Sequence, residues 1–141
     1  ALYAAAGEVV ATAEARPWTR ILAERLLRPL GMSQTTLSTR EMSRLDNFAR
    51  GYTWSEAEKK NVLLPFRDLP SVAPAGCVNS NVLEMSRWVR LMLGGGVLEG
   101  KRYLSDASYQ EMLKQRTQVS GTAGYGLGWF IRKWRGLTVY E

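Results

Sequence analysis

The chain of 141 residues contains no histidine and a single cysteine, Cys77. Without histidine, these residues cannot form a Ser-His-Asp triad, a Cys-His dyad or a metal site with imidazole ligands. A lone cysteine excludes a disulfide within the chain and a zinc cluster built on cysteines. A catalytic thiol at Cys77 is not expected either, because no histidine or second cysteine is available to activate it.

Long hydrophobic runs are also missing. The composition, 45% hydrophobic and 23% charged, is typical of a globular protein. No apolar segment is long enough to span a bilayer, so no membrane span is expected in this chain. Residues 1–10 lack the basic leader of a signal peptide and include Glu8. Because the chain has no initiator methionine, the localisation stays unknown.

The formal net charge of +6 raises the question of nucleic-acid binding. The basic residues are scattered along the chain, and no dense basic cluster with interleaved aromatic residues marks a binding face. Scattered charge of this kind affects solubility more than the choice of partners. The pattern favours a solvated basic surface, and no nucleic-acid partner is expected.

Helical spacing of apolar residues is clearest near the N-terminus. It predicts a helix over residues 2–13 with one stripe facing a core, formed by Leu2, Ala5, Ala6, Val9, Val10 and Ala13. Pro17 is suited to open a second helix, since its missing N–H costs nothing there. The apolar side of that helix is expected to consist of Trp18, Ile21, Leu22 and Leu26. A charged row of Arg20, Glu24 and Arg28 is predicted on its other side, four residues apart.

Pro29 and Gly31 are expected to end the second helix. A short helix is possible within residues 40–50. The stretch from Gly51 to Pro74 contains three prolines, counting Pro74, and shows no sustained period. This stretch predicts a long loop with brief strands, and loops of such length are usually functional or disordered.

A third strong helix signal begins at Asn81, which together with Glu84 has the spacing of a capping box. The buried stripe of this helix is predicted to be Val82, Met85, Val89 and Met92, with Trp88 beside it. The glycines at 94–96 should end it, and another helix should begin at Ser105. Alternation then predicts a strand from Tyr125 to Ile131, a turn over 132–136 and a returning strand over 137–140.

Both ends of the chain look cut. The last strand stops at Glu141 without a turn, and the first helix begins at residue 2 without a capping residue before it. A lone two-stranded hairpin is also marginal in water. We therefore expect the chain to be an excerpt from a larger protein.

Three segments together resemble the serine β-lactamase-like superfamily, which includes class C β-lactamases, penicillin-binding D-alanyl-D-alanine carboxypeptidases and related esterases. They are ERLLRPLGMSQT at 24–35, PAGCVNSNVLEMSRW at 74–88 and YGLGW at 125–129, and residues 104–112 fit a weaker element between the last two. The segments occur in the order of the family and with plausible spacing. The residues that carry the structural motif are Pro29, Leu30, Gly31, Met32, Asn81, Glu84, Trp88, Tyr125, Gly126, Gly128 and Trp129.

In this family, catalysis rests on Ser-x-x-Lys, then Tyr-x-Asn or Ser-x-Asn, then Lys-Thr-Gly or His-x-Gly. None of these motifs occurs in the chain, so no catalytic residue is assigned to it. The resemblance implies that the chain covers the stretch between the second and third motifs of a parent serine hydrolase. That enzyme would act through a serine ester on a β-lactam, a D-amino-acid peptide or an ester, without a metal or organic cofactor. The isolated chain is predicted to be inactive, and its substrate would be a small molecule or peptide bound through the parent.

The implied fold class is α+β: a mostly helical inserted domain plus a C-terminal β-hairpin belonging to the antiparallel sheet of the parent. Residues 1–120 would form the helical domain, with a long loop at 51–79, and residues 121–141 would form the strand pair of the incomplete α/β domain.

The resemblance also implies that Pro74, Ala75, Gly76 and Cys77 line the substrate cleft. Class C enzymes carry a tyrosine near the position of Gly76, and glycine would widen the pocket there. The alternative is a tight turn that needs a positive φ at Gly76. Cys77 replaces the usual second glycine of the loop, so its backbone is not expected to be left-handed.

The remaining motif residues have structural explanations beside functional ones. Capping accounts for Glu84. Trp88 and Trp129 could stack on a ligand, although tryptophans in helix and strand patterns usually belong to a core. Gly126 and Gly128 lie within a strand pattern, which argues against a dinucleotide loop and favours close packing against a helix.

Two rival functions remain open. One is a non-catalytic scaffold or binding protein whose family motifs have decayed. The other is a free-standing helical module that uses its positive charge on acidic surfaces. The second predicts salt-sensitive binding to anionic polymers, but its exposed hairpin would be prone to aggregation.

Overall fold

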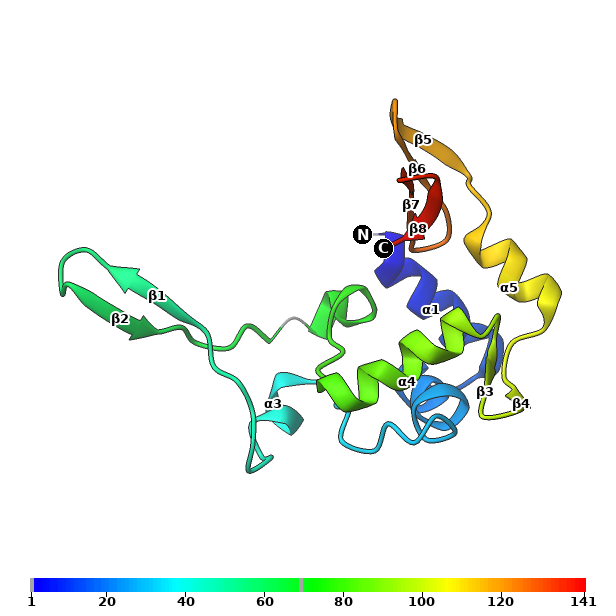
Figure 1. Ribbon diagram of the computed structural model, residues 1–141. Coiled ribbons are helices and arrows are strands. Elements are labelled where there is room, and N and C mark those ends of the chain that lie inside the picture. The colour runs from blue at the N-terminus through cyan, green and yellow to red at the C-terminus, as the bar shows by residue number, and fades with distance from the viewer. Residues whose placement is uncertain (1, 69) are drawn as a thin grey trace. The chain divides into compact units, whose positions relative to one another are not determined.

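The computed structural model describes residues 2–68 and 70–141, and Figure 1 shows the helices and strands of its α+β fold. The chain divides into two compact units after Arg87. Leu69, in the predicted long loop, lies outside the described residues. The boundary predicted at residue 120, between a helical domain and a sheet domain of a parent protein, stays a prediction. Within the described ranges, no helix is both long enough and apolar enough to cross a membrane.

The first helix, α1 (Leu2–Glu14), is where it was predicted, but its buried face was predicted wrongly. The expected stripe is exposed throughout: Leu2, Ala5, Ala6, Val9, Val10 and Ala13. Gly7 is the only buried residue of the helix, and it packs against Pro74 of η2 (Pro70–Ala75). A Cβ at Gly7 would lie 2.4 Å from the Pro74 Cγ, so α1 approaches the η2 segment through its smallest residue. This close approach leaves the larger apolar side chains of α1 in solvent.

The second helix runs from α2 (Trp18–Leu22) into a π-helical turn, η1 (Ala23–Leu27). Of the predicted apolar side, Ile21 is buried at 6% exposure, while Trp18, Leu22 and Leu26 are partly buried. Leu27, which was not predicted to face the core, is also 6% exposed. The predicted pair between Arg20 and Glu24 is present, with Arg20 Nε 2.8 Å from the carboxylate. Arg28, the third member of the predicted row, makes no ion pair with any residue that the structure describes.

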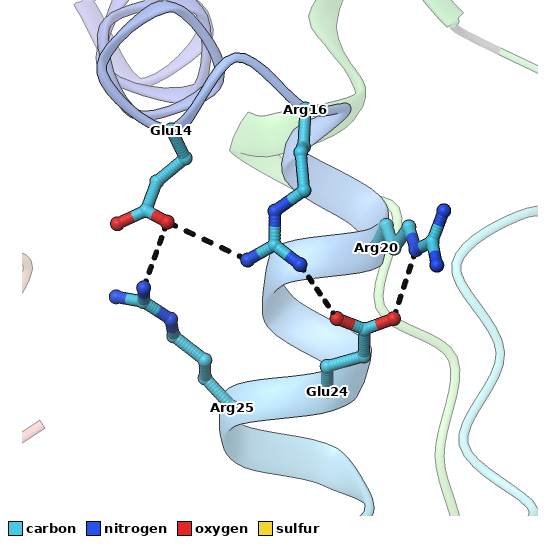
Figure 2. A network of polar contacts seen from close by, with 5 residues as sticks. All are labelled: Glu14, Arg16, Arg20, Glu24 and Arg25. Atoms are coloured by element: carbon cyan, nitrogen blue, oxygen red, sulfur yellow. Dashed lines mark hydrogen bonds and ion pairs between the residues drawn. The ribbon is translucent and has the colours of Figure 1, made fainter.

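A network of five charged side chains takes the place of the simple row (Figure 2). Arg16 donates to Glu24 at 2.8 Å and lies 3.4 Å from Glu14, while Arg25 donates to Glu14 at 2.7 Å. Glu14 is the last residue of α1, so the network ties the end of α1 to α2 and η1. The hydrogen bond from Arg20, reinforced by Arg16, lowers the pKa of the Glu24 carboxyl below its ordinary range.

The end of the second helix is a Schellman motif, which explains the Pro-Leu-Gly-Met sequence. Met32 N–H donates to the Leu27 carbonyl at 2.8 Å, and Gly31 N–H donates to the Arg28 carbonyl at 2.9 Å. Gly31 has φ = +71°, the left-handed conformation that this motif requires. Met32 and Leu27, which flank the turn, are both buried, as is Leu30.

The middle of the first unit is mostly irregular. The helix considered for residues 40–50 is confined to α3 (Thr39–Met42), where the Ser38 side chain accepts from the Glu41 N–H. The predicted brief strands are β1 (Tyr52–Ser55) and β2 (Lys60–Leu63), which form an antiparallel hairpin.

The helix predicted from Asn81 is α4 (Val82–Leu93), but most of its predicted stripe is exposed. Val82, Met85 and Val89 are 81%, 39% and 50% exposed, and only Met92 of the predicted set is buried. The buried face runs instead through Glu84, the partly buried Trp88 and Leu91. The periodicity was correct, but the side chosen was wrong because Glu84 has polar partners that make its burial favourable.

The second unit contains the end of α4, a short hairpin and one further helix. The helix α4 ends before the glycines at 94–96, as predicted. The hairpin consists of β3 (Val97–Leu98) and β4 (Lys101–Arg102). The helix α5 (Asp106–Leu113) begins after Ser105, whose hydroxyl accepts from the Ser108 N–H at 3.1 Å.

Four antiparallel strands, paired in sequence order, complete the second unit: β5 (Thr117–Ser120), β6 (Ala123–Tyr125), β7 (Phe130–Trp134) and β8 (Leu137–Tyr140). The returning strand over 137–140 was predicted correctly. The continuous strand predicted from Tyr125 to Ile131 was wrong, because Gly126 N–H donates to the Trp129 carbonyl at 2.8 Å and closes a turn there. The turn predicted at 132–136 is confined to Arg135 and Gly136, both with positive φ.

Candidate functional site

The Glu84 carboxylate joins two segments that the sequence analysis singled out separately. One oxygen accepts the Gln34 N–H at 2.7 Å, and the other accepts the Thr35 hydroxyl at 2.6 Å. Ser80 Oγ lies 2.7 Å from the same Thr35 oxygen. Since the Thr35 proton points to the carboxylate, Ser80 is the donor to Thr35. Glu84 is 7% exposed, and its two oxygens are both used in this arrangement.

Only half of the predicted capping box is present. Asn81 Oδ1 accepts the Glu84 N–H at 3.0 Å, as expected. The Glu84 side chain does not return to the Asn81 backbone, because it is engaged by Gln34 and Thr35. Capping therefore explains Asn81, whereas the role of Glu84 is to connect the turn after Met32 with the start of α4.

The loop before α4 is fixed at its far end as well. Thr36 and Asn79 form an isolated antiparallel bridge, with both N–H to carbonyl distances at 2.9 Å. The Asn79 side chain also donates to the Cys77 carbonyl at 2.8 Å. Three anchors, at Asn79, Ser80 and Glu84, thus hold the loop that ends in the α4 N-terminus.

This loop borders a cavity of about 650 Å³ in the first unit. Ala75, Gly76 and Cys77 line it, whereas Pro74, the fourth residue predicted for the cleft, packs on Gly7. A volume of this size is within the range of small-molecule sites. That the cavity is part of a substrate cleft stays a prediction.

The structure decides between the two interpretations of Gly76. Gly76 is absent from the residues with positive φ, so no tight turn demands glycine there. A Cβ at this position would meet no heavy atom within 4 Å. Glycine at position 76 therefore leaves open space where a side chain could stand.

The thiol of Cys77 is half-buried beside this space. Burial is the main cause that raises the pKa of the Cys77 thiol, and the Glu41 carboxylate adds to it. A raised pKa keeps the thiol protonated at neutral pH, which disfavours a nucleophilic role.

In the second unit, Trp88 and Trp129 stack with ring centroids 6.4 Å apart and planes inclined by 12°. Both side chains are partly buried. Gly126 lies close to the end of α5, where a Cβ would stand 2.9 Å from the Lys114 carbonyl oxygen. Gly128 has φ = +87° in the turn before β7. These positions are explained by packing and turn geometry.

No group of three or more metal-ligating side chains is assembled in the parts of the chain that the structure describes. The motif residues instead make structural contacts, such as the one between Arg87 and the Leu30 carbonyl at 3.2 Å.

The sequence analysis missed the contacts of Thr35 and Gly7, which hold the candidate site together. For Gly7, the one available signal was that a glycine stands in the middle of an apolar helix. Glycine destabilises a helix at such a position, so its presence suggests a close contact that a side chain would block.

Solved structures share this fold at low sequence identity. The octameric penicillin-binding protein homologue from Pyrococcus abyssi matches 94% of the chain with a TM-score of 0.77 at 20% identity, over 29% of its own length. The D-amino acid amidase from Ochrobactrum anthropi SV3, solved with L-phenylalanine amide, matches 98% of the chain with a TM-score of 0.70 at 23% identity, over 39% of its own length. The fold is thus that of penicillin-binding proteins and related amide hydrolases.

Sequence comparison gives the family itself. Residues 1–140 match the Beta-lactamase family, and the chain belongs to this family. Penicillin-binding protein 4 of Amycolatopsis lactamdurans is 30% identical over 148 aligned positions, which cover 98% of the chain and 38% of that protein. The chain therefore spans less than half the length of the relatives that it matches.

Proposed function

We propose that the chain forms one wall of the substrate cleft of a serine hydrolase that works through an acyl-enzyme. The substrate would be a β-lactam, a D-amino-acid peptide or amide, or an ester. The nucleophilic serine and its lysine would come from polypeptide other than these residues, since no Ser-x-x-Lys motif occurs among them. The 141 residues alone are proposed to lack hydrolytic activity.

The observation that carries this proposal is the anchored loop before α4. The Glu84 contacts and the Thr36–Asn79 bridge fix the loop at its end, and Ala75, Gly76 and Cys77 then line a cavity of about 650 Å³. A wall that binds substrate must be held rigidly, because small displacements of a binding group reduce catalysis strongly. Membership of the Beta-lactamase family supports this chemistry, as do relatives named as a D-amino acid amidase and as a penicillin-binding protein.

The proposal can be tested by transplantation into penicillin-binding protein 4 of Amycolatopsis lactamdurans. The segment of that protein that aligns with this chain is replaced by residues 1–141, and the chimaera is incubated with a fluorescent penicillin. We expect covalent labelling that survives denaturation and that disappears when the serine of the Ser-x-x-Lys motif of the acceptor is replaced by alanine. A chimaera that melts cooperatively but is not labelled would contradict the proposal and favour the non-catalytic scaffold.

The isolated chain provides the second arm of the test. We expect no turnover of nitrocefin or p-nitrophenyl esters above the buffer rate. Saturable turnover by the purified chain would show that the reacting groups lie within these 141 residues and would overturn the proposal.

A further inference from the structure

The hairpin of β1 and β2 forms a sheet of its own in the first unit (Figure 1). Each of its strands has an outer edge that no other strand covers among residues 2–68 and 70–141. A lone hairpin is marginally stable in water, and an uncovered edge is a template for pairing with another chain. The two outer edges are therefore candidate surfaces for a partner strand.

The backbone of β1 presents hydrogen-bonding groups at its outer edge. Leu64 N–H donates to the Gly51 carbonyl at 2.9 Å, so these two residues form a hydrogen-bonded pair. In antiparallel strands, hydrogen-bonded and non-hydrogen-bonded pairs alternate along the ladder. Tyr52 and Trp54 therefore belong to non-hydrogen-bonded pairs and direct their N–H and C=O groups away from β2. These groups bond to no segment outside the hairpin that the structure describes.

The two outer edges differ in charge. The strand β2 contains Lys60, and Lys59 precedes it in the turn. Lysine on an edge strand opposes pairing with another chain. The strand β1 contains no charged residue, and its aromatic side chains Tyr52 and Trp54 are 60% and 56% exposed on one face. The edge of β1 is thus the one suited to a partner.

A second copy of β1 is complementary to this edge when the two strands run antiparallel about a two-fold axis at Thr53. Tyr52 then lies opposite Trp54 of the second copy, and the outward backbone groups of these two residues bond to each other. The side chains of opposite residues share one face of a sheet, so two Tyr–Trp pairs form beside each other. Cross-strand aromatic pairs of this kind stabilise a sheet.

The charges at the ends of β1 fit the same alignment. Arg50 precedes the strand and Glu56 follows it, so each Arg50 approaches Glu56 of the second copy. The Arg50 guanidinium lies over the rings of Phe48 and Phe66, 5.9 and 5.5 Å from their centroids, and has no carboxylate partner in the described part of the chain. Glu56 accepts from Trp54 Nε1 at 2.7 Å, which holds its carboxylate beside β1.

We propose that two copies of the chain associate through their β1 edges into one four-stranded antiparallel sheet, in the order β2-β1-β1-β2. The interface is isologous, and it is closed because the two edges that remain are those of β2, which carry Lys60. The proposal goes beyond the proposed function and does not depend on it, since only residues of the first unit take part.

Sedimentation equilibrium of the 141-residue chain tests the association. We expect the apparent mass to rise with concentration from that of a monomer to that of a dimer, and no further. Thr53→Lys places two lysines opposite each other on the axis, so the dissociation constant should rise at least about fivefold. Asn61→Lys, which adds the same charge at an exposed residue of β2, is the control and should leave it unchanged.

Charge reversal tests the alignment of the strands. Arg50→Glu and Glu56→Arg should each weaken dimerisation, because each places like charges beside each other at both ends of the strand pair. The double variant Arg50→Glu/Glu56→Arg should restore it. Arg44→Glu, at an exposed arginine outside the hairpin, should have no effect. A double variant as weak as the single ones would contradict the alignment.

A disulfide provides a measurement that does not require weakening the dimer. In a Cys77→Ser background, Thr53→Cys places two thiols at a non-hydrogen-bonded pair, where the Cα atoms are about 4.5 Å apart and a disulfide can form. Oxidised glutathione should therefore convert this variant to a covalent dimer. Asn61→Cys in the same background should stay largely monomeric.

Thermal melts establish that the chain and each variant are folded, and any that do not melt cooperatively are measured in the chimaera with penicillin-binding protein 4. A chain that stays monomeric, assembles beyond a dimer or responds equally to Thr53→Lys and Asn61→Lys would overturn the inference. A monomeric chimaera would overturn it as well, because other polypeptide of the longer protein would then cover the β1 edge.

Discussion

The hydroxyl of Thr35 donates to the carboxylate of Glu84 at 2.6 Å across 49 positions of sequence. This bond links the Schellman turn at the end of the second helix with the start of α4. It also explains why an acidic residue is buried on α4 while the apolar residues Val82 and Val89 remain exposed. The two segments that resembled family motifs are therefore parts of one structural unit.

The first prediction concerns this link. Glu84→Ala should lower the free energy of unfolding by about 1–3 kcal/mol, because the part-buried Gln34 N–H and Thr35 hydroxyl both lose their acceptor, at about 0.5–1.5 kcal/mol per hydrogen bond. Urea unfolding monitored by circular dichroism measures the loss. Glu99→Ala, which removes an exposed partner of Arg90, serves as the control and should change stability by about 0.5 kcal/mol or less.

A double-mutant cycle tests whether Thr35 and Glu84 act on each other. Because the residues are in contact, the combined effect of Thr35→Val and Glu84→Ala should be smaller than the sum of the single effects by at least about 0.5 kcal/mol. Strict additivity would mean that the bond contributes nothing to stability.

The second prediction concerns the contact of Gly7 with Pro74. At a solvent-exposed position inside a helix, Gly→Ala raises the free energy of unfolding by about 1 kcal/mol. Here the new Cβ would lie 2.4 Å from Pro74 Cγ, and overpacking of this kind costs typically about 1–3 kcal/mol. Gly7→Ala should therefore lower the melting temperature. Adding Pro74→Ala, which removes the opposing ring atom, should restore part of the lost melting temperature. A higher melting temperature in Gly7→Ala alone would refute the packing argument.

The third prediction is the pH dependence of the charged network of Figure 2. The hydrogen bond from Arg20 keeps the pKa of Glu24 in the folded chain below its ordinary value. A depressed folded pKa gives stability that is complete above the unfolded pKa, about 4.3, and is lost as the pH falls through the folded pKa. Glu24→Gln should therefore reduce the drop in melting temperature between neutral pH and about pH 3.

The control for this measurement is Glu8→Gln. Glu8 is exposed on α1 and has no ion-pair partner in the described part of the chain. Its replacement should leave the pH dependence unchanged. If the melting temperature of Glu24→Gln depended on pH in the same way as that of the unmodified chain, the network would contribute nothing to the pH dependence of stability.

The fourth prediction concerns the reactivity of Cys77. Since burial raises the pKa of this thiol, its reaction with iodoacetamide at pH 8 should be slower than that of an unfolded peptide containing the same residue. The rate should continue to rise above pH 9 as the thiolate forms. In urea, the rate should increase to that of an ordinary cysteine. Fast alkylation of the folded chain at pH 7 would contradict the half-buried position of the thiol.

Local signals in the sequence predicted several boundaries well. Gly31 and Gly94 mark the ends of helices, Ser105 caps α5, and the capping bond of Asn81 is present. Each of these features depends on a few neighbouring residues and on backbone preferences that glycine or a short polar side chain satisfies locally. The resemblance carried by the Pro-Leu-Gly-Met turn and the Tyr-Gly-Leu-Gly-Trp segment likewise identified the family correctly.

The direction of burial was not predictable in the same way. Helical periodicity identified an apolar stripe on α1 and on α4, yet Val9 and Val89 are exposed while Gly7 and Glu84 are buried. Which side of a helix is covered depends on what lies opposite, here the ring of Pro74 and the donors of Gln34 and Thr35. Likewise, the space beside Gly76 is defined by segments that are far apart in sequence.

The sequence by itself determined where the longer helices begin and end, that these residues cannot use histidine chemistry, and the family of the chain, because these follow from residue types and short spacings. Only the tertiary structure decided which faces are covered, how Glu84 is satisfied and where the cavity lies. A helix face is buried, or a polar side chain hydrogen-bonded, only when a second segment packs against it. The sequence of one segment does not reveal which other segment that will be.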